Sequence, residues 1–423
     1  MSKDNLIEDA SKKREVVYDL DQTYSAIIKR QFKKNRAAVW SLRFLIVIVF
    51  IGLLAPFIAN NKPLYAKYEG NTYFPAFREV AVEFGMAKWQ PELIKIINWK
   101  TTEFESVVWP LIPYAEEERD FANAHYKSPF GEQEVESLRW RHWLGTDESG
   151  VDLLSGLING TTIAVKVGVI SMSISAFIGI IIGAFAGFYG DDNLSASRIR
   201  IIFNVLFIPI ALFYAIKVGW IGIILFFVLM IIPNLLAMPF EKIKVLNAKT
   251  NIPLDLLIMR FIEIFNSIPK LLLIMSIVAI LGQSIMLLMI IIGATSWTGI
   301  ARFTRAELLR VRNLEYMEAA KSLGYGELRK IFIHALPNSL APVLISIAFG
   351  VAGAILTEAS LSFIGLGAEA GVATWGKILT LARTEPSAWW LAIFPGFAIF
   401  ITVTIYNLIG EGLIDALDPK LKQ

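Results

Sequence analysis

The sequence predicts an all-α integral membrane protein with a soluble insert on the outer side of the membrane. Apolar side chains make up 55% of its 423 residues and charged side chains 18%, against about 45–50% and about 25% in soluble domains. The apolar residues come in blocks as long as the roughly 20 residues that a membrane-spanning helix needs. Lys and Arg (40) nearly balance Asp and Glu (37), so we expect no basic surface for nucleic acid.

The absence of cysteine from the sequence excludes disulfides, thiolate metal ligands and a cysteine nucleophile. The three histidines, His125, His142 and His334, are too scattered to predict a metal site or a hydrolytic triad. The segment Gly371–Ile378 comes within one residue of a phosphate-binding loop, but Ile378 has no hydroxyl for Mg²⁺. We therefore expect no enzymatic activity, catalytic residue, metal or cofactor in this chain.

The first apolar block, Trp40–Ala59, follows a basic segment and precedes no small-residue cleavage pattern, so it predicts a retained anchor and not a signal peptide. The chain then divides into a cytoplasmic tail (1–39), a first transmembrane helix (40–60), an extracytoplasmic insert (61–150) and a membrane core (151–423). The insert contains five tryptophans: Trp89, Trp99, Trp109, Trp140 and Trp143. These supply enough aromatic surface for a small folded domain.

Seven further apolar blocks follow, separated by Gly, Pro or charge: Thr162–Phe188, Ile201–Ile216, Trp220–Met238, Leu271–Leu281, Ile285–Ile300, Leu340–Leu356 and Trp390–Ile409. Eight spans place the loops rich in Lys and Arg, and both termini, in the cytoplasm, where positively charged loops of membrane proteins accumulate. The blocks between 201 and 238 predict an extra hairpin. Six spans remain if this hairpin lies on the membrane surface.

The cytoplasmic loop at 301–337 predicts one short helix with an apolar stripe. Asn313 is a suitable N-cap, and Gly324 can take the left-handed conformation that ends a helix. The apolar stripe has the helical spacing i, i+3, i+4 and i+7 and consists of Tyr316, Ala319, Ala320 and Leu323. Such a stripe can dock closely on another surface. A second helical stretch, Glu327–Ala335, should end at Leu336-Pro337 because proline stops a helix.

Several motifs in this chain resemble those of one transporter family. Glu318-Ala319-Ala320, followed by Gly324 and Leu336-Pro337, is similar to the signature loop of ABC importer permeases, and His334 points to the peptide and nickel branch. Three other stretches resemble the second permease subunit of dipeptide and oligopeptide importers: His142–Asp152, Thr357–Gly367 and Asp415–Leu421. The resemblance runs from about His142 to Leu421, and it departs at the long insert (61–141) and at the hairpin.

This resemblance implies a permease core of the type I ABC-importer kind, with six core spans plus the extra hairpin. It also implies a bacterial inner-membrane location, a second permease subunit, two ATPase subunits that hold ATP and Mg²⁺, and an extracytoplasmic solute-binding protein. Glu318 would orient the helix in a groove of the ATPase, Ala319 and Ala320 would allow close approach, and Gly324 would turn the chain. The solute remains open between a peptide, a nickel complex and an antibiotic peptide.

Three further questions stay open at this stage. The alternative to an importer subunit is a self-sufficient secondary carrier or channel, in which the loop helix is only structural and no second chain is needed. Glu358 and Ser360 lie in a polar cluster at the outer end of a span, which makes them candidates for the translocation pathway; neighbouring hydroxyls could equally satisfy Glu358. The acidic run Glu116–Glu118 predicts either a solvated face or a contact with a delivery protein or the partner permease.

Overall fold

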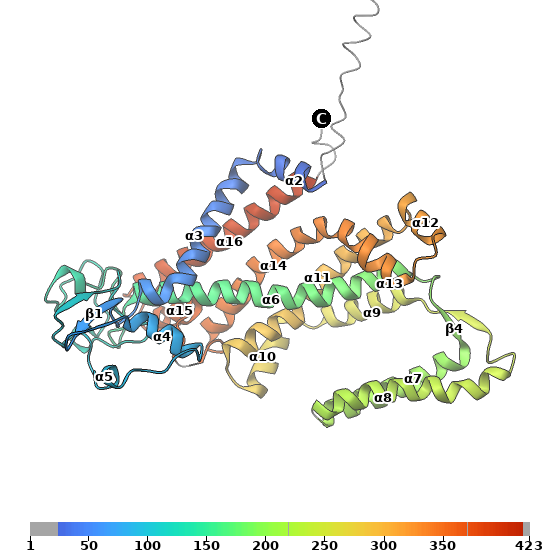
Figure 1. Cartoon of the computed structure of the whole chain (residues 1–423), viewed down its shortest axis with the longest axis horizontal. Coiled ribbons are helices and arrows are strands. Elements are labelled where there is room, and N and C mark those ends of the chain that lie inside the picture. Colours follow the sequence, from blue (N-terminus) through green and yellow to red (C-terminus); the bar gives the residue numbers. More distant parts are fainter. Residues whose placement is uncertain (1–23, 219, 370, 418–423) are drawn as a thin grey trace, which may run out of the picture. The chain divides into compact units, whose positions relative to one another are not determined.

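The computed structural model describes residues 24–218, 220–369 and 371–417, and these are mostly helical (Figure 1). The predicted tail up to residue 23 and the end of the Asp415–Leu421 match lie outside the described residues. Among the described residues, seven helices are long and apolar enough to cross a membrane, or eight if one bent pair is a single span. The all-α membrane fold predicted from the sequence is therefore confirmed.

The long helices are α3 (Arg36–Ile58), α6 (Leu153–Tyr189), α7 (Arg198–Lys217), α8 (Trp220–Ala237), α11 (Ile285–Val311), α14 (Leu336–Ile364) and α16 (Trp390–Leu417). The bent pair is α9 (Leu254–Ser267) and α10 (Lys270–Leu281), which meet at 75°. The block predicted at Leu271–Leu281 is the second helix of this bent pair. The shorter helices are α2 (Tyr24–Phe32), α4 (Pro75–Glu83), α5 (Pro91–Ile94), α12 (Glu315–Ser322), α13 (Glu327–Arg329) and α15 (Trp375–Thr384).

Single turns of 3₁₀ helix lie at Phe121–Asn123, Leu138–Trp140 and Met238–Lys242, and a π-helical segment at Lys330–Ala335. The chain divides into two compact units. The first comprises the described parts of 1–172, 278–292 and 344–423, and the second comprises 173–277 and 293–343.

In the first unit, the outer insert folds around its aromatic residues. Strands β1 (Tyr65–Tyr68), β2 (Asn71–Tyr73) and β3 (Ser106–Val108) form an antiparallel sheet in the order β2-β1-β3. Tyr73, Leu93 and Trp99 are buried together, and Trp89 and Trp109 pack against them. Trp143, by contrast, is 54% exposed. In the same unit α3 lies beside α16 (Figure 1).

In the second unit, a row of glycines brings α6 against α11. Gly179, Gly183 and Gly187 repeat every four residues, so they share one face of α6. A Cβ at Gly183 would lie 2.4 Å from the carbonyl oxygen of Ala301, and those at the other two glycines would be nearly as close to α11. Only glycine permits this approach, as at other membrane helix interfaces built from small residues.

The predicted hairpin is present as α7 and α8, which lie side by side (Figure 1). Its base is closed by the antiparallel strands β4 (Ser195–Ser197) and β5 (Lys249–Asn251). Asn204 and Asn234 donate to each other's side-chain oxygens at 3.2 and 3.4 Å between the two helices. Their amides also donate to the carbonyl oxygens of Arg200 and Met230 in their own helices, so these polar groups are satisfied within the hairpin.

One local prediction was wrong. The helical stretch that begins at Glu327 does not end at Leu336-Pro337, because helical structure continues to Ile364. Pro337 is the second residue of α14, where a missing N–H is tolerated. The π-helical segment at Lys330–Ala335 precedes it directly, and such a widened turn accommodates an interrupted hydrogen-bond ladder.

Candidate functional site

The short helix predicted in the cytoplasmic loop is α12. Its N-cap is Leu314 and not Asn313, because the Asn313 amide donates to the carbonyl oxygen of Leu309 at 3.2 Å. Gly324 adopts φ +75°, as predicted. The backbone N–H groups of Gly324 and Tyr325 donate to the carbonyl oxygens of Lys321 and Ala320 at 3.0 and 3.2 Å. The helix therefore ends in a hydrogen-bonded turn that requires glycine.

The apolar stripe of α12 is divided between two environments. Ala320 is 5% exposed, and it faces the protein's own core with Met317, which is 4% exposed. Tyr316 and Leu323 keep 39% and 70% of their surface exposed. Ala319 and Glu318 are also exposed. The predicted docking face thus keeps Tyr316, Ala319 and Leu323 and loses Ala320, since the helix needs one edge to attach to the membrane core.

That attachment is a compact apolar cluster. Met317 lies in it with residues from α6, α11 and the segment before α14: Ala184, Phe188, Leu308, Val311, Ile331 and Ala335. Leu336 packs against the same cluster, whereas Pro337 is exposed. The Asn338 amide donates to the Tyr316 hydroxyl at 3.4 Å. The structure therefore brings the two halves of the predicted loop motif together.

A polar hollow of about 570 Å³ lies beside α12. Glu318 and Lys321 of α12 line it, together with Arg312 and Lys330. Lys330 is ion-paired with Glu327 at 2.8 Å, and the Arg312 guanidinium donates to the carbonyl oxygens of Gly187 and Phe188 at 3.3 and 3.4 Å. Protein–protein interfaces have an apolar core and a polar rim, and docking of another protein on α12 stays a prediction.

Comparison with known proteins decides the family. The family described as binding-protein-dependent transport system inner membrane component matches residues 245–423, and the N-terminal transmembrane domain of oligopeptide transport permease C matches residues 23–75. A dipeptide transport system permease, DppC of Alkalihalophilus pseudofirmus, is 33% identical over 282 residues, which are 66% of this chain and 73% of the relative. The chain belongs to the binding-protein-dependent transport permeases. It is a permease subunit of an ABC importer and a multi-pass inner-membrane protein.

Two other relatives match this permease along most of its length. The peptidoglycan transport system permease YejE of Agrobacterium fabrum is 27% identical over 424 residues, 94% of each chain. The oligopeptide transport system permease OppC of Haemophilus influenzae is 34% identical over 281 residues, 66% of this chain and 70% of the relative. Because the first match covers 94% of this permease, most of the outer insert and the hairpin falls within it.

The two pathway candidates in α14 lie in different surroundings. Glu358 is 3% exposed and accepts a hydrogen bond from the Ser362 hydroxyl at 2.6 Å. Ser360 is exposed, and its hydroxyl donates to the carbonyl oxygen of Leu356 at 2.7 Å within the same helix. The structure thus brings Glu358 to Ser362 and not to Ser360, and a pathway role for either residue stays a prediction.

The acidic run of the insert holds the segment before α15 and the first turn of α15. Glu117 accepts hydrogen bonds from the Gly371 N–H at 2.9 Å and the Lys377 ammonium at 2.8 Å, and Glu116 accepts from the Ala373 N–H at 3.4 Å. The stretch that resembled a phosphate-binding loop therefore binds carboxylates of its own chain. Burial raises the pKa of the Glu116 carboxyl, partly opposed by the Ala373 N–H.

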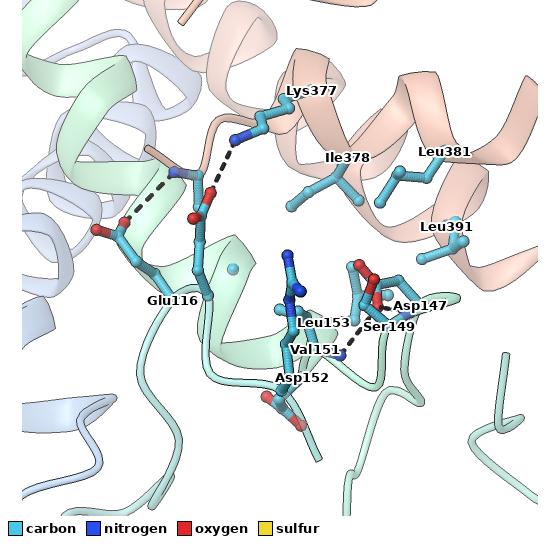
Figure 2. A pocket seen from close by; sticks show the side chains of 14 residues that line it. Glu116, Asp147, Ser149, Val151, Asp152, Leu153, Lys377, Ile378, Leu381 and Leu391 are labelled. Carbon is cyan, nitrogen blue, oxygen red and sulfur yellow. Dashed lines mark hydrogen bonds and ion pairs between the residues drawn. The ribbon is translucent and has the colours of Figure 1, made fainter. Parts of the chain in front are cut away.

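These residues border an outer cavity of about 290 Å³ (Figure 2). In Figure 2, Glu116 and Lys377 lie at one side, and Ile378, Leu381 and Leu391 form an apolar wall on the other. The acidic run itself was the sequence feature that pointed to a contact of the insert. Its partners lie more than 250 residues away, so the contact could not be read from local pattern.

His142 is structural, as expected for an isolated histidine. It is fully buried, with Nδ1 2.8 Å from Asp152 and Nε2 3.1 Å from Asp120. The Tyr114 ring packs against the His142 ring, with 4.2 Å between the ring centroids. Among the residues that the structure describes, no group of three or more His, Asp or Glu side chains could hold a metal ion.

Sequence reasoning missed two residues that the structure places in informative positions. Met317 attaches α12 to the core, and its position three residues before Ala320 could have revealed this. Lys270 lies at the break between α9 and α10, and its ammonium donates to the Ser296 hydroxyl at 2.7 Å. A lysine at the edge of an apolar block was the available signal. Arg260 and Glu263 of α9, three residues apart, form a local ion pair at 2.7 Å.

Proposed function

We propose that this permease forms half of the translocation pathway of an ATP-driven importer for short peptides, and that it couples to a separate ATPase through α12. The observation that carries the proposal is the division of α12 into two faces. Met317 and Ala320 fix the helix to its own core, and Tyr316, Ala319 and Leu323 face outward. An ATPase groove that accepts this outward face would bury apolar surface rimmed by the Glu318 carboxylate.

The attachment of α12 suits transmission of movement. Its cluster joins the ends of α6 and α11 to the segment that leads into α14. Close-packed apolar clusters move as a body because they have low compressibility. A rotation of the ATPase subunits would therefore shift several spans together and alternate the opening of the pathway between the two sides of the membrane.

The partners in this proposal are a second permease, two ATPase subunits that bind ATP and Mg²⁺, and an extracytoplasmic binding protein. Hydrolysis takes place on the ATPase chains and not on this one. The peptide substrate is supported by the names of the relatives, which transport dipeptides, oligopeptides or peptidoglycan. The basic tail and the basic loops support a cytoplasmic location for both termini, which leaves the insert outside, where the binding protein arrives.

Co-purification from native membranes tests the coupling. The Glu318→Lys, Ala319→Trp double variant changes two exposed side chains, so the fold should persist while the docking face acquires a bulky ring and the opposite charge. We expect an ATPase to elute with the wild-type permease and to be lost from the variant. The control carries the same two changes on the outer insert, Glu103→Lys with Ala122→Trp, at positions that are also exposed. Equal ATPase in all three eluates, or none with the wild type, contradicts the proposal.

A further inference from the structure

A lysine with no ion pair among the described residues, Lys270, lies at the break between α9 and α10. The chain leaves α9 at Ser267 and enters α10 at Lys270 with a bend of 75°. The Lys270 ammonium donates to the Ser296 hydroxyl of α11 at 2.7 Å. Among the described residues, no carboxylate lies within ion-pairing distance of it.

The position of Ser296 places this ammonium beside the uncharged stretch of α11, which runs from Ile285 to Ala301. Ser296 lies eleven residues after the start of α11 at Ile285, which corresponds to about 16 Å at 1.5 Å per residue. The next charged residue of α11 is Arg302, six residues further on, or about 9 Å. The Lys270 side chain also reaches sideways to a neighbouring helix, and not along its own helix toward a membrane surface.

A second polar pair lies directly beside it. The Thr298 hydroxyl of α11 donates to the side-chain oxygen of Asn266, in the last turn of α9, at 3.1 Å. Polar side chains therefore meet from both sides of the break: Asn266, Lys270, Ser296 and Thr298. Lys270 is half-buried, and only one of its three N–H donors is used within the described residues. Lipid tails cannot accept the other two, so the ammonium must face water, a solute or another protein chain.

We propose that Lys270 binds the carboxylate of the peptide as it passes through the pathway, with Ser296 holding the ammonium in place. A carboxylate is the ligand that completes a compact cation with free N–H donors. Broken spans form solute sites in other transporters for the same reason, since backbone and polar side chains at a break can only be tolerated where they line a cavity. This inference rests on the proposed peptide import. A carboxylate of the second permease offers the same chemistry, and the experiment separates the two sources.

The natural absence of cysteine allows a direct test. Lys270→Cys gives the complete importer a single thiol in this subunit, and 2-bromoethylamine converts it to a side chain that again ends in an ammonium. We expect the variant to take up a labelled tripeptide about tenfold more slowly than the wild type, and aminoethylation to restore at least half of the rate. The aminoethylated variant should also regain the wild-type preference for the tripeptide over its C-terminal amide, each at a concentration that equally saturates the binding protein, whereas the untreated thiol should show no such preference.

The matched control is Lys217→Cys at the end of α7, where the same alkylation should leave uptake unchanged. A Lys270→Cys thiol that never reacts while the wild type imports peptide overturns the proposal, because the residue then faces lipid. An aminoethylated variant that regains the uptake rate but does not prefer the free tripeptide over its amide also overturns it, because the carboxylate then belongs to the second permease. If the wild type imports no peptide, the proposed function fails instead.

Should Lys270→Cys fail to assemble, the preference of the importer for the free peptide over its amide decides the matter. Lys270→Arg keeps a cation and should retain this preference, whereas Lys270→Met should lose it. An unchanged preference in Lys270→Met overturns the proposal.

Discussion

Leu323 offers the most quantitative test of the docking face. It exposes 70% of its surface in the isolated permease, and full burial of a leucine side chain contributes about 1.5–3 kcal/mol. Covering this exposed part with an ATPase groove should therefore contribute about 1–2 kcal/mol, so that Leu323→Ala weakens ATPase binding roughly 5–30-fold. The permease itself should fold normally, because the side chain has little contact with its own chain.

The assay is a titration of the purified ATPase against the permease pair in nanodiscs, with the dissociation constant as the readout. Leu111→Ala is the matched control, because Leu111 is 82% exposed on the outer insert and loses the same atoms. An affinity for Leu323→Ala within twofold of the wild type would refute the burial of this face against the ATPase. Equal weakening by Leu111→Ala would show that the measured effect is not local to α12.

Two further predictions concern stability. Gly183→Ala should destabilise the second unit by about 1–3 kcal/mol, because its Cβ would lie 2.4 Å from the Ala301 carbonyl oxygen; thermal unfolding in detergent measures this. Burial raises the pKa of the Glu116 carboxyl above its ordinary value of 4.5, so the folded state holds the carboxyl proton more tightly than the unfolded state does. The resulting stabilisation of the fold is present at low pH and is lost as the pH rises through the raised pKa. Glu116→Gln, which is always neutral, should therefore raise the unfolding temperature more at pH 8 than at pH 5.

Each of these two stability predictions has a control measurement. Gly299→Ala adds the same methyl group to α11 where nothing lies within 4 Å, so it should be neutral or slightly stabilising; equal loss in both variants would contradict the close packing of α6 on α11. For Glu116→Gln, an equal shift at pH 5 and pH 8 would show that proton binding at Glu116 does not contribute to stability.

The spans could be predicted from the sequence because lipid imposes a simple rule, a run of apolar residues about as long as the bilayer is thick. Gly324 could be predicted because a helix end with a left-handed residue has a local signature. The inward position of Ala320 could not, because helical periodicity gives a stripe but not the edge that meets the core. That core comes from Ala184, Leu308 and Ile331, which are distant in sequence.

The contact of Glu116 and Glu117 with the segment before α15 escaped prediction for the same reason, since its partners lie at 371–377. The error at Pro337 has a different origin. Proline was treated as a stop, whereas its position at the start of α14, after a π-helical segment, needs no N–H. Lys270 was overlooked because a single lysine has no motif. Its meaning comes from Ser296, on the next helix.

The two proposed sites of this permease share one helix. Leu308 and Val311 of α11 belong to the cluster that holds α12, and Ser296 lies twelve residues before Leu308 on the same uninterrupted helix, about 18 Å away. Trp297 packs with Ile262 of α9, which holds the break at Lys270 against this helix. A displacement of α12 by the ATPase therefore reaches the hydroxyl that positions the Lys270 ammonium. If that displacement changes the affinity for a carboxylate, bound peptide must change the affinity for the ATPase conformation by the same factor. ATPase stimulation by peptide should consequently disappear in Lys270→Met, while α12 still holds the ATPase.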